Sequence, residues 1–182
     1  MASLKEIRTR ITSVNSTMQI TSAMKMVAAA RLKKSQDAIL RMRPYANKLQ
    51  EILENLSASL DTSDENIYAQ QRNPDKILIV MVTSNRGLCG GFNANILTKA
   101  HQSIVKHQKN ENIESDFIVV GKKGTSVKRY YGYNIIAEFP KLDIISEVKE
   151  VLPIAKMVVD GYTKGDYDKV MVAYTDFVNA SN

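Results

Sequence analysis

The sequence predicts an α/β protein in which a long amino-terminal coiled-coil helix precedes a mostly parallel, Rossmann-like domain. Apolar residues recur with a three-four spacing from position 4 to position 60, which is the period of a coiled-coil seam. After residue 75, short apolar runs alternate with helical patterns, which favours a parallel sheet with helices on both faces. We therefore divide the chain into a helix at 1–60, a connection at 61–75 and an α/β domain at 76–182.

Fourteen of the seventeen positions with this spacing are apolar. At about 1.5 Å per residue, the helix would reach roughly 85 Å and must project from any small domain. Ser3 followed by Glu6 predicts its start through a capping box, and Pro44 predicts a bend because the pattern continues in phase beyond it. The predicted seam is formed by Leu4, Ile7, Ile11, Val14, Met18, Ala28, Leu32, Ile39, Met42, Leu49, Leu53 and Leu56.

A seam of this length needs a partner helix, and nothing after residue 61 is long enough to supply one. We expect the partner to lie outside this sequence and the chain to be a fragment. Residues 20–30 (ITSAMKMVAAA) carry small and methionine side chains on most of their circumference, so we expect this stretch to be surrounded on several faces.

The α/β domain is predicted from a change of period. Residues 76–83 (KILIVMVT) read as a strand buried on both faces. Further strands are expected at 116–121, 133–139 and 168–174. Helices are expected at 93–109, at 122–131, and at 146–163, where Pro153 would break or bend the last one.

Charge is distributed unevenly. The chain has 25 basic and 19 acidic residues, of which ten and four lie in residues 1–60, so residues 61–182 hold fifteen of each. The excess is densest between Arg31 and Arg43 and would attract an acidic partner unless it is a solvated helix face. A nucleic-acid partner is disfavoured, because the basic residues overlap the seam instead of lying outside it and the tyrosines are not interleaved with them.

The longest apolar run, residues 77–82, is too short to cross a bilayer, and no apolar stretch follows the amino-terminal charges as in a secretory signal. We therefore expect neither a transmembrane segment nor a signal or transit peptide. Cys89 is the only cysteine, which excludes an internal disulfide and weakly favours a reducing compartment.

Residues 84–91 (SNRGLCGG) follow a buried strand and precede a helix, which is where phosphate-binding loops lie. Their glycine spacing fits neither the dinucleotide fingerprint nor the P-loop, and the turn 121–124 (GKKG) also lacks the full pattern. We favour a tight turn that presents Arg86, Leu88 and Cys89 on a surface. Nucleotide binding is the alternative, since free helix amides could still bind an anion.

No catalytic or metal-binding constellation is predicted, and no cofactor. A nucleophilic Cys89 would need a nearby histidine, but His101 and His107 lie on different faces of one predicted helix. Asp143, Glu147 and Glu150 are typical of the carboxylates that favour a helix start.

Several motifs carry a resemblance that covers the whole chain. Residues 5–8 (KEIR), 20–29 (ITSAMKMVAA), 34–36 (KSQ), 43–46 (RPYA) and 86–91 (RGLCGG) occur in the same order as in the gamma subunit family of the F-type ATP synthase, which this sequence resembles. In that family the amino-terminal helix pairs antiparallel with a carboxy-terminal helix to form a shaft inside a hexamer of alpha and beta subunits. This chain ends before that second helix.

The resemblance implies a non-catalytic central-stalk rotor that couples transmembrane proton flow to ATP synthesis or hydrolysis on the hexamer. It implies as partners the alpha and beta subunits, the epsilon subunit and the c-subunit ring, at the cytoplasmic face of a bacterial plasma membrane. It also implies an interface formed by Met24, Lys25, Met26, Val27, Arg31, Lys33, Lys34, Arg86, Leu88 and Cys89. Two alternatives stay open: a nucleotide-binding α/β protein with a helical interaction arm, and a coiled-coil adaptor unrelated to the synthase.

Overall fold

The computed structural model describes residues 3–59, 67–68, 72–108, 113–142 and 148–176, in two compact units that we treat separately. The first unit, residues 1–63, contains helix α1, Leu4–Ser59. The second unit, residues 64–182, contains the sheet and the remaining helices. The bounds predicted from the sequence, 1–60 for the helix, 61–75 for the connection and 76–182 for the α/β domain, stay a prediction. Most of the predicted connection, 61–75, and the tail at 177–182 lie outside the described residues.

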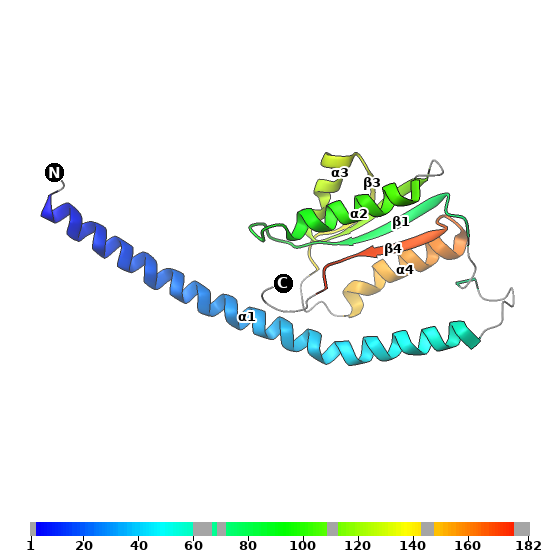
Figure 1. The fold of residues 1–182 in the computed structure, drawn as a ribbon, viewed down its shortest axis with the longest axis horizontal. Helices are drawn as coiled ribbons and strands as arrows, with labels where there is room; N and C mark the ends of the chain where they lie inside the picture. Colours follow the sequence, from blue (N-terminus) through cyan, green and yellow to red (C-terminus); the bar gives the residue numbers. More distant parts are fainter. Residues whose placement is uncertain (1–2, 60–66, 69–71, 109–112, 143–147, 177–182) are drawn as a thin grey trace. The chain divides into compact units, whose positions relative to one another are not determined.

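Helix α1 is continuous over 56 residues, about 84 Å at the usual rise. It begins where the capping sequence predicts, and the backbone N–H of Ile7 donates to the carbonyl oxygen of Ser3. Pro44 lies inside the helix without ending it. Figure 1 shows the α1 ribbon changing direction where its colour turns from blue to cyan, as expected for a proline that removes one backbone hydrogen bond.

The second unit is a four-stranded parallel sheet in the order β3-β2-β1-β4. Its strands are β1 (Lys76–Val82), β2 (Glu114–Val120), β3 (Asn134–Phe139) and β4 (Lys169–Ala173). All three strand pairs are parallel. This order is that of the first four strands of the doubly wound Rossmann sheet, so the fold class is confirmed and the strand limits differ from the predicted ones by one or two residues.

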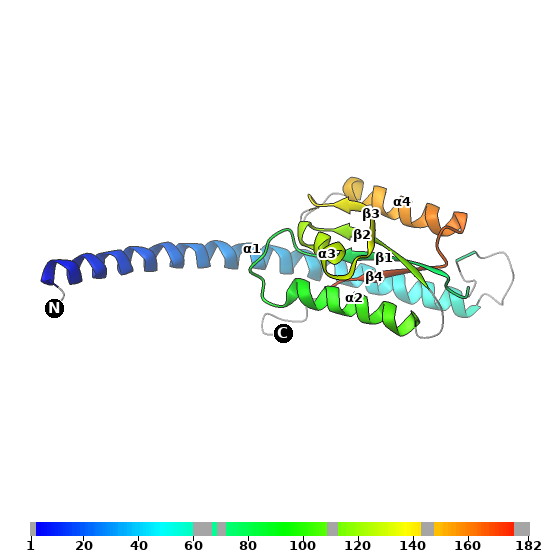
Figure 2. The same ribbon diagram turned by 90° about the horizontal axis from the view of Figure 1, so that it is seen from above.

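Two helical layers cover the sheet. Helix α2 (Phe92–Gln108), the short helix η1 (Lys122–Thr125) and α3 (Ser126–Tyr131) follow β1 and β2, and α4 (Val148–Lys164) precedes β4. Figure 2 shows α2 and α4 on opposite sides of the sheet. The region predicted as one helix at 122–131 consists of η1 followed by α3, and α4 is unbroken at Pro153.

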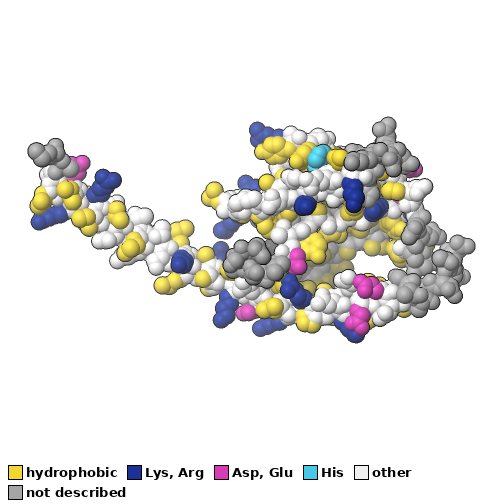
Figure 3. All heavy atoms as spheres, in the orientation of Figure 1, with side chains coloured by type: hydrophobic (Ala, Val, Ile, Leu, Met, Phe, Trp, Pro, Cys, Tyr) yellow, Lys and Arg dark blue, Asp and Glu magenta, His cyan; other side chains and the backbone are white. Residues whose placement is uncertain are grey.

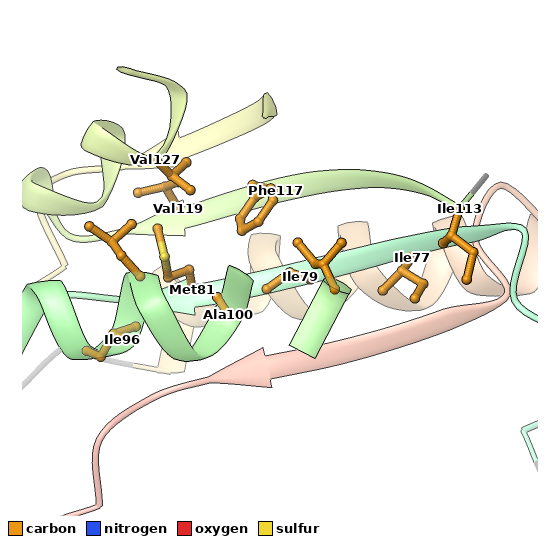
Figure 4. Packing of buried hydrophobic residues seen from close by; sticks show 11 residues of the cluster. Ile77, Ile79, Met81, Ile96, Ala100, Ile113, Phe117, Val119 and Val127 are labelled. Carbon is orange, nitrogen blue, oxygen red and sulfur yellow. The ribbon is translucent and has the colours of Figure 1, made fainter. Parts of the chain in front are cut away.

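The core has two halves, one on each face of the sheet. On the α2 side, Ile77, Ile79 and Met81 of β1 pack against α2, Phe117 and Val119 of β2, and Val127 of α3 (Figure 4). On the α4 side, Leu78, Val80 and Ile118 pack against Ile154 and Tyr167. Strand β1 is buried on both faces, as its unbroken apolar run predicts.

Candidate interaction surfaces

The seam of α1 is uncovered. The eleven large apolar residues of the predicted seam retain between 38% and 69% of their accessible surface, and Ala28 is exposed as well. A globular protein buries most leucine and isoleucine side chains, because each fully buried one contributes about 1.5 to 3 kcal/mol. A contiguous apolar stripe of this length is typical of a surface that another helix covers.

Residues 20–30 of α1 are exposed on every face, with Ile20, Met24, Met26 and Val27 each more than half exposed. Lys25, Arg31, Lys33 and Lys34 are exposed too. Because successive helix residues turn by about 100°, the cations between Arg31 and Arg43 point to all sides of the helix. The predicted interface residues of α1 are therefore accessible, and they do not form a single patch.

The second candidate surface is the loop at residues 84–91, which follows the carboxyl end of β1. Its base is held by a pair of side chains: Asn93 accepts from the backbone N–H of Ser84 at 3.0 Å, and its Nδ2 donates to Ser84 Oγ at 2.8 Å. Asn93 Nδ2 also lies 3.1 Å from Cys89 Sγ, and Ser84 Oγ donates to the carbonyl of Arg86. The loop is therefore held by hydrogen bonds from Ser84 at its start and from Asn93 just after its end.

The tip of this loop projects into solvent. Leu88 is fully exposed and has a φ of 60°, in the left-handed region that a side chain with a Cβ rarely adopts. Arg86 and Cys89 beside it are exposed. An exposed leucine in an unfavourable backbone conformation on a braced loop is typical of a contact surface. All three side chains are exposed, and their contact with a partner stays a prediction.

Some of the amide groups that flank this turn are engaged. The N–H of Lys123 donates to the carbonyl of Ser84 at 3.0 Å, and that of Lys122 donates to Asn85 Oδ1 at 3.1 Å. The N–H groups of Phe92 and Asn95 donate to carbonyls of the loop. A phosphate-binding loop needs free amides that converge on the anion. The amides of Phe92, Asn95, Lys122 and Lys123 are therefore not available to an anion.

Cys89 and His101 have different neighbours. Cys89 lies with Ser84 and Asn93, whereas the His101 ring stacks on Tyr131 at 4.3 Å between centroids and its Nδ1 lies 2.8 Å from the Tyr133 hydroxyl. Asp143, Glu147 and the His107 side chain lie outside the described residues. Within the described ranges, no group of three or more His, Cys, Asp or Glu could hold a metal ion, and no helix is long and apolar enough to span a bilayer.

A polar network lies at the opposite, amino-terminal edge of the sheet. The carboxylate of Asp116, only 8% exposed, accepts from Asn134 Nδ2 at 2.8 Å and from the Tyr167 hydroxyl at 3.2 Å, and it pairs with Lys76 Nζ at 3.3 Å. Burial, with the nearby Asp116 charge, raises the pKa of Tyr167 to about 12. The hydrogen bond to Asp116 raises the pKa of Lys76. This network stabilises the strand ends, far along the strands from the loop at 84–91.

Sequence reasoning missed Asn93, which braces the loop, and Asp116, which organises the network. Asn93 reaches back nine residues to Ser84, so no local turn motif indicates the contact. Asp116 begins a predicted strand, and its partners on β3 and near β4 become neighbours only through strand order. Neither residue carries a signal in the linear pattern.

Comparison with known proteins gives a consistent result. A family model described as ATP synthase matches residues 3–182. The ATP synthase gamma chain of Flavobacterium psychrophilum is 48% identical over 183 residues, which is 100% of this chain and 62% of the relative. That of Cytophaga hutchinsonii is 44% identical with the same coverage, and that of Chlorobaculum parvum is 40% identical over 97% of this chain and 61% of its own length. The chain thus spans about three fifths of the curated relatives.

Solved structures agree on the fold. The central stalk and c-ring structure of the Tetrahymena thermophila mitochondrial ATP synthase contains a chain that matches with a TM-score of 0.62 and 26% identity, over 90% of this chain and 68% of that one. The Euglena gracilis mitochondrial ATP synthase rotor matches with a TM-score of 0.53 over 96% of this chain and 58% of that one, and at 18% identity it supports the fold alone.

Proposed function

Since this chain belongs to the ATP synthase family and is similar in sequence to ATP synthase gamma chains, we propose that it forms part of the central-stalk rotor of an F-type ATP synthase. In this role it couples transmembrane proton flow to ATP synthesis or hydrolysis on a hexamer of alpha and beta subunits. The observation that carries the proposal is the uncovered, 56-residue α1 with its continuous apolar seam. A helix of this kind serves contact and force transmission and carries no bond chemistry.

The shaft acts by being asymmetric. Three equivalent nucleotide sites around a single helical shaft meet different side chains, because α1 presents methionines, small residues and lysines at different angles. Each site is thereby biased toward a different conformation, which amounts to a coupling free energy between rotor angle and nucleotide affinity. Rotation then converts ion flow into ordered binding and release.

The seam of α1 binds a second helix supplied by the remainder of a gamma chain. The curated relatives are longer than this chain by more than a third of their own length, which is ample for a helix that matches α1. Leucine and isoleucine at the seam positions suit knobs-into-holes packing. The pairing would bury the stripe that lies exposed in the isolated chain.

The exposed stretch at 20–30 and the loop tip at 86–89 contact the beta subunits, and the cations Lys25, Arg31 and Arg86 face carboxylates there. Exposed ion pairs of this type contribute under about 1 kcal/mol each. Such weak contacts suit a part that must leave each partner in turn. The α/β unit lies beside the epsilon subunit and the c-ring, at the cytoplasmic face of the membrane.

Reconstitution tests the proposal. A full-length gamma chain containing this sequence, mixed with purified alpha and beta subunits, should give a complex that hydrolyses ATP. Replacing Leu49 and Leu53 by aspartate should abolish assembly, because two charges would enter the helix pair. The matched control replaces two exposed α1 residues off the seam, Gln50 and Asn47, by aspartate and should assemble. If the full-length chain neither assembles nor alters hydrolysis, the rotor function is wrong.

The loop has its own test in a whole ATP synthase that contains the full-length chain and is reconstituted in sealed vesicles, where proton pumping can be measured. Replacing Asn93 by alanine removes the brace of the loop and leaves the tip residues unchanged, so hydrolysis should become less tightly coupled to proton pumping. The control is Asn95→Ala. Asn95 lies two residues further along α2 and its side chain is exposed. Equal coupling in both variants would show that the loop conformation does not matter for the rotor.

The second candidate is a nucleotide-binding α/β protein with a helical arm, favoured only by the Rossmann-like strand order. It predicts micromolar binding of ATP or a dinucleotide to the purified chain by titration calorimetry. The glycine spacing of residues 84–91, which fits neither the dinucleotide fingerprint nor the P-loop, argues against this outcome. A coiled-coil adaptor, in contrast, predicts no specific binding to the alpha and beta subunits.

A further inference from the structure

Residues 61–182 carry equal numbers of basic and acidic residues, but these charges are distributed unevenly among the helices. Helices α2, η1 and α3 contain no aspartate or glutamate, and their six exposed cations are Lys99, Lys106, Lys122, Lys123, Lys128 and Arg129. We call these six residues the basic face. Figure 3 shows dark-blue side chains distributed over the surface of α2 and α3. The other helix, α4, carries Glu150 and Asp160 among its lysines and is nearly balanced.

The three elements lie on the same side of the sheet and touch one another. Ile96 and Ala100 of α2 and Val127 of α3 belong to one core cluster over that side, while Ile154 of α4 belongs to the other. The His101 ring of α2 stacks on Tyr131 at the end of α3. The six cations of the basic face therefore all come from elements on one side of the sheet.

We propose that the basic face binds the anionic headgroups of a membrane surface. Five of its six cations are lysines, which act as flexible point charges, whereas specific recognition of a single carboxylate or phosphate favours the fork of arginine. Tyr130 is 69% exposed next to Arg129, and an exposed tyrosine suits the headgroup layer because its ring is apolar and its hydroxyl polar. Lysines near an anionic leaflet attract it additively.

Helix α1 is basic as well, but its geometry is less suited to a plane. Its cations between Arg31 and Arg43 point to all sides, so a flat surface meets only some of them. Those of α2, η1 and α3 belong to one side of a sheet. This inference is independent of the proposed rotor function, because it concerns the binding of the chain itself to lipid.

Vesicle sedimentation of the 182-residue chain tests the proposal. The chain should bind vesicles containing about one third phosphatidylglycerol, and should not bind pure phosphatidylcholine, at roughly 0.1 M salt. Replacing Lys123 and Lys128 by glutamate should weaken the binding about tenfold or more. Near-UV circular dichroism confirms that the variant is folded, and a Lys123→Gln, Lys128→Gln variant should show a smaller loss in the same direction.

Two control variants carry the same change of net charge elsewhere. Replacing Lys149 and Lys156 of α4, or Lys33 and Lys34 of α1, by glutamate should weaken binding less than about threefold. An equal loss in all three variants would mean that binding follows net charge, and the proposal would be wrong. It would also be wrong if the chain ignored anionic vesicles and bound polyglutamate through Lys123 and Lys128, since the partner would then be an acidic protein.

Discussion

Removal of the Asp116 side chain should lower the free energy of unfolding of the α/β unit strongly, because this carboxylate is buried and bonded to several neighbours. It joins three neighbours that are distant in sequence: Asn134 on β3, Tyr167 before β4 and Lys76 at the start of β1. The Asp116→Ala substitution leaves the Tyr167 hydroxyl and the Asn134 amide without this acceptor in a site where Asp116 itself is 8% exposed. Strand ends on both sides of β1 would lose a common anchor.

The magnitude follows from the contacts. Hydrogen bonds to a charged group contribute about 1.5 to 3 kcal/mol each, and Asp116 accepts two from uncharged donors. Its ion pair adds little, because the Lys76 side chain is 39% exposed and solvent screens the interaction. Part of the gain is offset by the cost of burying the carboxylate. We expect a loss of about 3 to 5 kcal/mol in the free energy of unfolding.

Urea denaturation followed by tyrosine fluorescence measures this loss, since the chain has eight tyrosines and no tryptophan. Tyr133 and Tyr167 report on the α/β unit, whereas far-UV circular dichroism is dominated by the separate helix α1. The matched control is Glu138→Ala, which removes an exposed carboxylate from β3 and should change stability by less than about 0.5 kcal/mol. A loss below about 1 kcal/mol for Asp116→Ala would refute the assignment of Asp116 as the organising residue.

Two further predictions concern the same unit. Gly121→Ala should destabilise the unit by roughly 3 kcal/mol or more, because the φ of Gly121 is 92° and a Cβ would meet the Thr83 carbonyl oxygen. The control Gly132→Ala, at a position with φ 71° and open space around it, should cost only about 1 kcal/mol, and urea denaturation measures both changes. Stability should fall between pH 10 and about 12, because the folded chain keeps the Tyr167 proton up to a pKa of about 12 and the unfolded chain releases it near 10. The expected loss in the free energy of unfolding is about 2 kcal/mol, and Tyr167→Phe should remove it from the pH profile.

The features that the sequence predicts best are those with a long, uniform period. The apolar repeat of α1 continues over more than fifty residues, so the polar residues at three of its positions, Thr21, Lys25 and Ser35, do not obscure the pattern. Strand β1 is recognisable because a run buried on both faces must be apolar at every position. Alternation of strands and helices then leaves a parallel sheet as the natural arrangement, and the observed pairing is parallel throughout.

The features that could not be predicted depend on which elements become neighbours. Asp116 meets Tyr167 only because β1 lies between β2 and β4, and charge counts cannot tell on which side of the sheet a lysine will lie. The division of one predicted helix into η1 and α3 has a local cause. Gly124 must pack against Val119 and Thr83, where a Cβ would come within 3 Å of both side chains, so the chain turns tightly there.

The carboxyl edge of the sheet shows how a Rossmann-like frame can serve contact instead of ligand binding. In dinucleotide-binding proteins, the first turn after β1 leaves its amides free for a phosphate. Here Ser84 and Asn93 close the turn with their own side chains, and the amide of Lys123 closes it from the neighbouring loop. Within this turn, Leu88 has an exposed, left-handed conformation. A loop made rigid in this way loses little conformational entropy when a partner binds its tip, so even weak contacts there can be selective.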